Sequence, residues 1–125
     1  MTEWNRKVHE AVYADLHANA LPVLLGGDHC LSIGSISAVA RHCRETNKKL
    51  RVLWLDAHAD FNTSDLSPTG NIHGIPVACL CGFGPEELTS IGGRTPALRP
   101  AWIREIGIRS VGVGGERFVH DHHLE

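Results

Sequence analysis

The chain has 125 residues, of which 42% are hydrophobic and 21% are charged, and its formal net charge is −2. This composition is typical of a folded globular domain, and the charge leaves no basic stripe for nucleic acid. No apolar run approaches the roughly 20 residues of a membrane-spanning helix, and the polar residues 1–7 do not resemble a secretory signal. We therefore expect one domain or part of one in the cytoplasm, with no nucleic-acid or membrane partner.

The first half of the chain predicts two helices on either side of a short strand. Helices are expected over residues 4–19 and 30–46, because apolar residues recur there on one stripe. Their apolar positions are Val8, Ala11, Val12, Leu16 and Ala20, then Ile33, Ile36, Val39 and Ala40. Between them, Pro22 ends the first helix, residues 23–25 form a short buried strand, and Gly26-Gly27 permits a tight turn.

The second half begins with residues 52–55, a run of branched and aromatic residues typical of a strand buried on both faces of a parallel sheet. The elements expected after it are a long loop over 61–76, a helix over 75–80, an irregular segment over 82–100, a helical turn over 101–105 and a strand over 110–113. Alternating strands and helices predict an α/β fold, a three-layer α-β-α arrangement with a parallel sheet of about three strands. So thin a sheet indicates that residues 1–125 are a partial domain of a larger fold.

The cysteines and most histidines point to no site of their own. The four cysteines (Cys30, Cys43, Cys79 and Cys81) form no Cys-x-x-Cys pair, so reduced, partly buried thiols are expected. His9, His17 and His42 fall on the predicted helices and are expected at the surface. The histidine-rich residues 120–123 could form a metal cluster, but a solvated connector is the expectation.

Metal-ligand residue types occupy every second position immediately after the strand at residues 52–55. They are Asp56, His58 and Asp60, and an extended chain would place all three side chains on one face. Ligands bind at the carboxyl ends of strands in open α/β sheets. His29 follows the preceding strand, and it would lie beside Asp56 and Asp60 if the two strands are neighbours. Mixed imidazole and carboxylate ligands suit Mn²⁺, Zn²⁺ or Fe²⁺, and the excess of oxygen favours Mn²⁺.

Two simpler interpretations compete at these positions. Asp56 and Asp60 could cap a following turn, with His58 an ordinary surface residue, although strict alternation behind a buried strand favours the metal site. Asp28 could cap the helix that follows it or could orient a metal ligand, and the sequence leaves both roles open.

Three motifs carry a family resemblance. Gly26-Gly27-Asp28-His29, Asp56-Ala57-His58-Ala59-Asp60 and Gly70-Asn71-Ile72-His73-Gly74 occur in the order and spacing of the ureohydrolases. The segments Asp60-Phe61-Asn62-Thr63 and 69–77 resemble the arginases in particular. The resemblance extends from about residue 21 to residue 78, and more loosely to the end of the chain.

The resemblance implies a partial arginase-like domain that hydrolyses L-arginine to L-ornithine and urea at a binuclear manganese site. His29, Asp56 and Asp60 would hold one Mn²⁺, and His58 with a bridging Asp56 would hold the other. Asp60 would also accept a hydrogen bond from the attacking hydroxide, and His73 would assist proton transfer.

The resemblance also implies a substrate site. Asn62, Thr69 and Asn71 match positions that bind the α-carboxylate of arginine in the family. Arginases commonly form oligomers, so a homo-oligomer is left open.

Several parts of the family pattern have no counterpart in this sequence. These are the first strand, the later Asp-x-Asp motif with two more metal ligands, and the acidic residue that binds the guanidinium group. Gly112 stands where an aspartate for the substrate's α-ammonium would be expected, and Glu116 could take part of that role. We therefore expect this chain by itself to be inactive or nearly so.

Three other functions compete with arginase. Agmatinase is disfavoured because Asn62, Thr69 and Asn71 fit a substrate with a carboxylate. Metallophosphoesterases share short fragments of these motifs, but in a different order. The third is a non-catalytic fragment that binds metal weakly or acts by association, and the missing ligands favour it.

Overall fold

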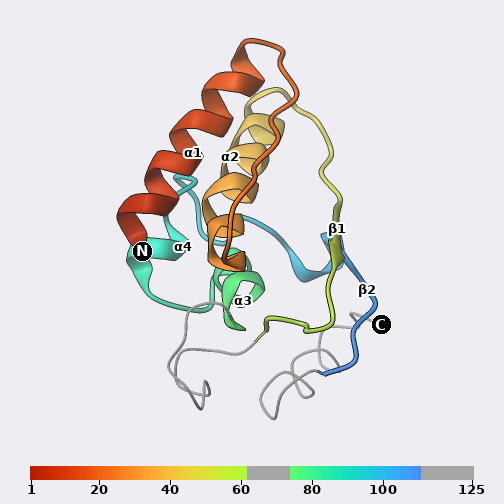
Figure 1. Cartoon of the computed structure of the whole chain (residues 1–125). Coiled ribbons are helices and arrows are strands. Elements are labelled where there is room, and N and C mark those ends of the chain that lie inside the picture. Colours follow the sequence, from red (N-terminus) through yellow and green to blue (C-terminus); the bar gives the residue numbers. More distant parts are fainter. Residues whose placement is uncertain (62–73, 111–125) are drawn as a thin grey trace.

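The computed structural model describes residues 1–61 and 74–110, and it places a pair of long helices beside a small sheet (Figure 1). Helix α1 (Thr2–His17) packs along helix α2 (Ser32–Glu45). Strand β1 (Val52–Leu55) lies parallel to strand β2 (Ile103–Ile106). The remaining elements are short: η1 (His29–Leu31), α3 (Pro76–Leu80), α4 (Glu86–Thr89) and η3 (Pro100–Trp102). No helix in this part of the chain is long and apolar enough to cross a bilayer.

The α/β architecture with a parallel sheet is confirmed, and so are the predicted helices over 4–19, 30–46 and 75–80. Helix α3 begins with Pro76, which suits the first helical turn because proline lacks a backbone N–H. All five residues of α3 are buried. Helix α3 packs against α2.

The interface between α1 and α2 is polar where the helices come closest. The Asn5 side chain is fully buried, and its Oδ1 accepts a hydrogen bond of 2.7 Å from the Gly34 backbone N–H. A Cβ at position 34 would lie 2.3 Å from the Asn5 carbonyl oxygen, so only glycine permits this approach. His9 is also buried, with 6% of its surface exposed. The predicted stripe on α1 was therefore wrong in part, because Ala11 and Ala20 are exposed while these polar residues face the partner helix.

The prediction that His9 lies at the surface was wrong for the same reason. Helical geometry places it one turn from Asn5 and three residues from Val12, on the face that α2 covers. Burial lowers the pKa of His9, and the charge of Arg41 lowers it further. The neutral imidazole stacks on Tyr13, with ring centroids 5.9 Å apart.

The sheet is covered on one face in the described part of the chain. Trp54 on β1 and Ile103 on β2 face a core that also holds Phe61, Leu80 and Leu98. The alternate residues of β1 point away, so that Leu53 is 62% exposed and Leu55 is 73% exposed. The prediction of a strand buried on both faces was therefore wrong for these residues, since the helices pack on one side only.

Two strand predictions also differ from the structure. Residues 23–25 are extended but form no strand, because no neighbouring strand among the described residues pairs with them. The helical turn expected over 101–105 is instead η3 followed directly by β2, which pairs with β1 from Val52↔Ile103 onward. Of the strand expected over 110–113, Ser110 forms a single parallel bridge with His58, and residues 111–113 lie outside the described part. The sheet there has two strands rather than about three.

Candidate metal centre

His29 reaches the site from a capped turn of helix. The segment Gly26-Gly27 bends the chain, and Asp28 then caps η1, its Oδ1 accepting a hydrogen bond of 2.9 Å from the Cys30 N–H. Of the two roles that the sequence leaves open for Asp28, the structure shows the capping role. The ring of His29 stands edge-on to the ring of Trp54, with centroids 5.9 Å apart. The His29 ring therefore contacts β1 through Trp54, although residues 23–25 do not pair with that strand.

Asp56 and Asp60 come from the chain immediately after β1. The Asp56 backbone N–H donates to the Ile106 carbonyl at 3.1 Å, which continues the sheet for one further residue. Asp60 has a φ of 50°, in the left-handed region that residues other than glycine adopt infrequently. This conformation turns the chain back, so that the side chain of Asp60, 6% exposed, joins that of Asp56, 10% exposed.

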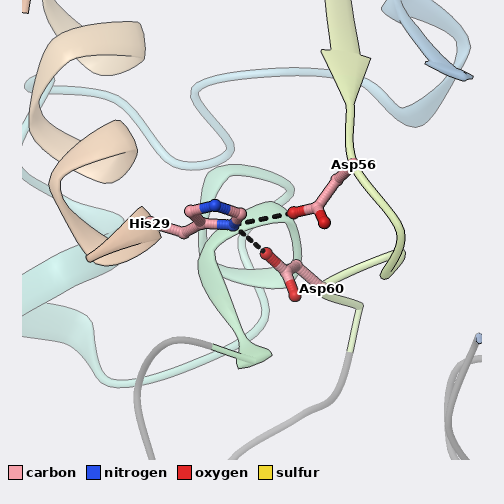
Figure 2. A group of neighbouring side chains, drawn as sticks. All are labelled: His29, Asp56 and Asp60. Carbon is pink, nitrogen blue, oxygen red and sulfur yellow. Dashed lines mark hydrogen bonds and ion pairs between the residues drawn. The ribbon is translucent and has the colours of Figure 1, made fainter. Parts of the chain in front are cut away.

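The three side chains meet at the imidazole of His29 (Figure 2). His29 Nδ1 lies 2.7 Å from Asp56 Oδ2 and 3.1 Å from Asp60 Oδ2. One ligand atom from each residue lies within 4.8 Å of the others, which is a spacing suited to a single cation. We call His29, Asp56 and Asp60 the metal group. Their convergence agrees with the metal site expected from the sequence.

His58 lies next to the metal group but outside it. Residues 56–57 form a bend rather than an extended strand, so the period of two that would align three side chains does not hold. The Asp56 side chain caps this bend, because its Oδ1 accepts a hydrogen bond of 3.1 Å from the His58 N–H. His58 Nδ1 is 3.6 Å from Asp56 Oδ1, and its side chain is 67% exposed. The capping interpretation of Asp56 is thus correct, and it coexists with the convergence of the metal group.

The metal group combines the imidazole of His29 with two carboxylates, and burial disfavours the anion of one of them, Asp60. The hydrogen bond with Asp60 raises the pKa of His29, and the charges of Asp56 and Asp60 add to that effect. Burial raises the pKa of Asp60, whereas the hydrogen bond with His29 lowers it. Positive charge is therefore drawn to the space between the carboxylates. A nitrogen and two carboxylate oxygens are a donor set that fits Mn²⁺, Zn²⁺ or Fe²⁺.

Glu105 is a further acidic residue near the metal group, and it was not among the site residues predicted from the sequence. It stands opposite Trp54 in the register of the sheet, on the covered face, and its Oε1 is buried without a hydrogen-bond partner among the described residues. Burial raises the pKa of Glu105 to about 7, and the charges of Asp60 and Asp56 raise it too. A strand assignment for 103–106 would have revealed it, because Glu105 then shares a face with Ile103.

The remaining predicted site residues lie outside the described part of the chain. These are Asn62, Thr69, Asn71 and His73, the positions Gly112 and Glu116, and residues 120–123. Their roles stay predictions.

A family model described as the arginase family matches residues 1–125. The chain is 41% identical over 121 residues to an arginase from Bacillus caldovelox and 38% identical over 121 residues to an arginase from Entamoeba histolytica. Each alignment covers 97% of this chain, but only 39% and 40% of the respective relatives. The chain therefore spans about two fifths of the length of these curated relatives.

Solved structures give the same result. The native B. caldovelox arginase at pH 5.6 superposes with a TM-score of 0.92 and 40% identity, covering 99% of this chain and 40% of that one. An E. histolytica arginase in complex with L-ornithine superposes with a TM-score of 0.87 and 38% identity, covering 97% and 40%. A Bacillus subtilis formimidoylglutamase, at 23% identity and a TM-score of 0.67, shares the fold.

Proposed function

This chain belongs to the arginase family, and we propose that it carries part of a site for the hydrolysis of L-arginine to L-ornithine and urea. The observation that carries the proposal is the convergence of His29, Asp56 and Asp60 at the end of β1. A solved relative with bound L-ornithine, the product of that reaction, supports the choice of substrate.

The proposed cofactor is manganese, with two ions in the complete site. His29, Asp56 and Asp60 would hold one ion, and Asp56 with the neighbouring His58 would contribute to the second. Divalent cations supply the Lewis acidity that makes water nucleophilic near neutral pH. The oxygen-rich donor set supports Mn²⁺ over metals that prefer sulfur or several imidazoles.

The chain's own residues would bind the substrate and move protons. The buried carboxylate of Asp60 would accept a hydrogen bond from the attacking water and so orient it. His73 would transfer a proton, and Asn62, Thr69 and Asn71 would bind the α-carboxylate of arginine. Of the two products, urea is neutral and has no carboxylate for these residues to bind, whereas ornithine keeps the carboxylate that they bind.

The 125-residue chain by itself is proposed to be inactive or nearly so. Three candidate ligands converge among the described residues, whereas two ions need two coordination spheres. The four free cysteines, three of them buried, support the proposed cytoplasmic location, where thiols stay reduced.

Calorimetric titration with Mn²⁺ tests the metal site. We expect micromolar or tighter binding by the chain, and a loss of more than about 100-fold in Asp56→Ala, since even residues that only support a ligand contribute up to that factor. Asp15→Ala is the matched control, because it removes an exposed carboxylate from α1. An absence of binding, or equal binding by the chain and Asp56→Ala, would refute the site.

A urea assay with arginine and with agmatine then tests the reaction. We expect little or no turnover by this chain with added Mn²⁺, and a preference for arginine in a full-length relative that shares Asn62, Thr69 and Asn71. Preference for agmatine would favour the decarboxylated substrate instead. Turnover by the chain at the rate of full-length arginases would overturn the proposed inactivity. If metal binds tightly without any turnover in a longer form of the protein, the non-catalytic alternative would hold.

A further inference from the structure

A second cavity lies at the opposite ends of the two strands from the metal group. It has a volume of about 500 Å³ and is bounded by residues 48–51, which lead into β1, and by residues 94–102, which lead into β2. Ala40, Cys43 and Arg44 of α2 close its third side. Because the strands are parallel, this cavity is at their amino ends, whereas the metal group follows the carboxyl end of β1.

The lining of this cavity is strongly basic. The sequence has 12 lysine and arginine residues and a net charge of −2, yet six of those cations line this one cavity, and no aspartate or glutamate does. They are Arg44, Lys48, Lys49, Arg51, Arg94 and Arg99. Among the described residues, none of the six is in an ion pair. We call this site the basic cavity.

Two of the guanidinium groups are held in place by the fold. Arg44 Nη2 donates a hydrogen bond of 2.9 Å to the Gly92 carbonyl, and the Arg99 guanidinium lies 5.7 Å from the centre of the Trp102 ring. Guanidinium groups bind phosphate with two parallel hydrogen bonds, and groups that are already positioned lose less entropy when they do so. The arrangement therefore favours phosphate over a diffuse cloud of counterions.

The basic cavity also has an apolar side. Trp102 and Pro96 line it, with Ala97 and Leu98 buried behind them. A volume of about 500 Å³ lies within the range of sites for small molecules and cofactors. An aromatic surface next to two positioned guanidinium groups and four further cations suits a ligand with both a planar ring and a chain of phosphates.

We propose that the basic cavity binds a nucleotide with two or three phosphates, with the phosphates against the arginines and the ring against Trp102 and Pro96. This site is separate from the metal group and does not depend on the proposed arginase function. A chelator distinguishes the two proposals, because nucleotide binding in the basic cavity needs no metal ion.

Calorimetry with ATP in the presence of EDTA tests the proposal, because the chelator excludes attachment of the phosphates through a metal ion. We expect a dissociation constant below about 1 mM, which corresponds to a favourable binding free energy of more than about 4 kcal/mol. Binding should weaken at least tenfold in Arg94→Gln and stay unchanged in Arg6→Gln, which removes the same charge from an exposed position on α1. It should also be unchanged in Asp56→Ala. Equal weakening in Arg94→Gln and Arg6→Gln, or no saturable binding, would overturn the site.

Two ligands separate the contributions of the phosphates and the ring. Tripolyphosphate should bind more weakly than ATP. Trp102→Leu should weaken ATP more than tripolyphosphate, because tripolyphosphate depends on Trp102 only through the position of Arg99. If both bind equally to the unaltered chain, the part of the proposal that concerns Trp102 is wrong. If citrate binds as tightly as tripolyphosphate, selectivity for phosphate is wrong.

A readout on the unaltered chain removes any dependence on how a variant folds. Cys43 lines the basic cavity and is partly exposed, whereas Cys79 and Cys81 are buried. Burial raises the pKa of Cys79 to about 11 and that of Cys81 to about 12, which keeps both thiols unreactive. ATP should slow the alkylation of Cys43 by iodoacetamide at least several-fold. Alkylation at an unchanged rate under saturating ATP would contradict the proposed location.

Discussion

Glu105 places a carboxyl group on the covered face of the sheet, where two carboxylates of the metal group already lie nearby. Burial raises its pKa to about 7 from an ordinary value of 4.5, and the charges of Asp60 and Asp56 act in the same direction. In the folded chain Glu105 therefore holds a proton over a pH range in which the unfolded chain has lost it.

This residue predicts a specific dependence of stability on pH. Between pH 4.5 and about 7 the folded state binds more protons at Glu105 than the unfolded state, so its contribution lowers stability as pH rises through that window. Glu105→Gln removes the titration, so it should be more stable than the unaltered chain at pH 8 and similar to it at pH 4.5. The gain is at most about 1.4 kcal/mol for each unit of pKa difference, and partial exposure reduces it.

Urea unfolding at a series of pH values measures the effect. Glu87→Gln is the control, because Glu87 is exposed on α4 and its replacement should leave the pH dependence as it was. A stability difference between Glu105→Gln and the unaltered chain that is constant from pH 4.5 to pH 8 would show that burial of the charge is not its cause.

At this scale the sequence indicated the metal group well and its surroundings poorly. Asp56, Asp60 and His29 could be predicted because residue types that bind metals follow shortly after short apolar runs in the sequence. Glu105 and His9 could not, because their burial depends on which strand or helix covers them, and a local pattern does not contain that information. The place of His58 was missed because the side chain of Asp56 caps a bend and ends the extended geometry.

At the scale of elements, the contact between α1 and α2 depends on one glycine. A Cβ at Gly34 would lie 2.3 Å from the carbonyl oxygen of Asn5, which is backbone and cannot rotate away. Gly34→Ala would push the helices apart and break the hydrogen bond from the Gly34 N–H to Asn5 Oδ1. We expect a loss of about 1–3 kcal/mol in the free energy of unfolding, as for other overpacked cores.

Thermal and urea unfolding of Gly34→Ala give this value directly. The matched variant is Gly27→Ala, since a Cβ there meets nothing within 4 Å. Similar stability of the two variants would mean that the helices accommodate the methyl group by a small shift, and that the close approach is not required.

Helices were predicted more accurately than strands for a physical reason. The apolar periodicity that predicts a helix is contained in residues close together in the sequence, and the buried Pro76 marks the start of α3. A strand needs a partner, and residues 23–25 have the composition of a strand without one among the described residues. Residues 103–106, whose Arg104 and Glu105 favour a helix, form β2 because Val52 to Leu55 offer free backbone groups beside them.

At the scale of the whole molecule, one apolar surface is left uncovered. Leu24, Leu53 and Leu55 line a hollow of about 430 Å³ next to His29 and Asp56, and all three leucines are exposed. Leu21, Val23 and Leu25 of the neighbouring extended segment are also exposed. Contiguous apolar surface of this kind favours association between chains, and so does a strand edge that no other described residue pairs with.

We therefore expect the isolated chain to self-associate through this surface. Size-exclusion chromatography with light scattering should show a mass that rises with concentration, and Leu53→Lys with Leu55→Lys should shift the chain toward a monomer. Trp4→Lys removes an exposed aromatic residue from α1 and should have little effect. A monomer at every concentration tested would contradict this self-association.

The parallel direction of β1 and β2 has an electrical consequence for the whole molecule. Strand β1 has four residues, so roughly 13 Å of strand separates the carboxylates of the metal group from the cations of the basic cavity. A net charge of −2 conceals this separation. Positive and negative charge are separated along β1 between these two sites, so an approaching cation and an approaching anion would be drawn toward opposite ends of the strand. Two ligands of opposite charge would thus arrive from opposite directions without competing for the same approach.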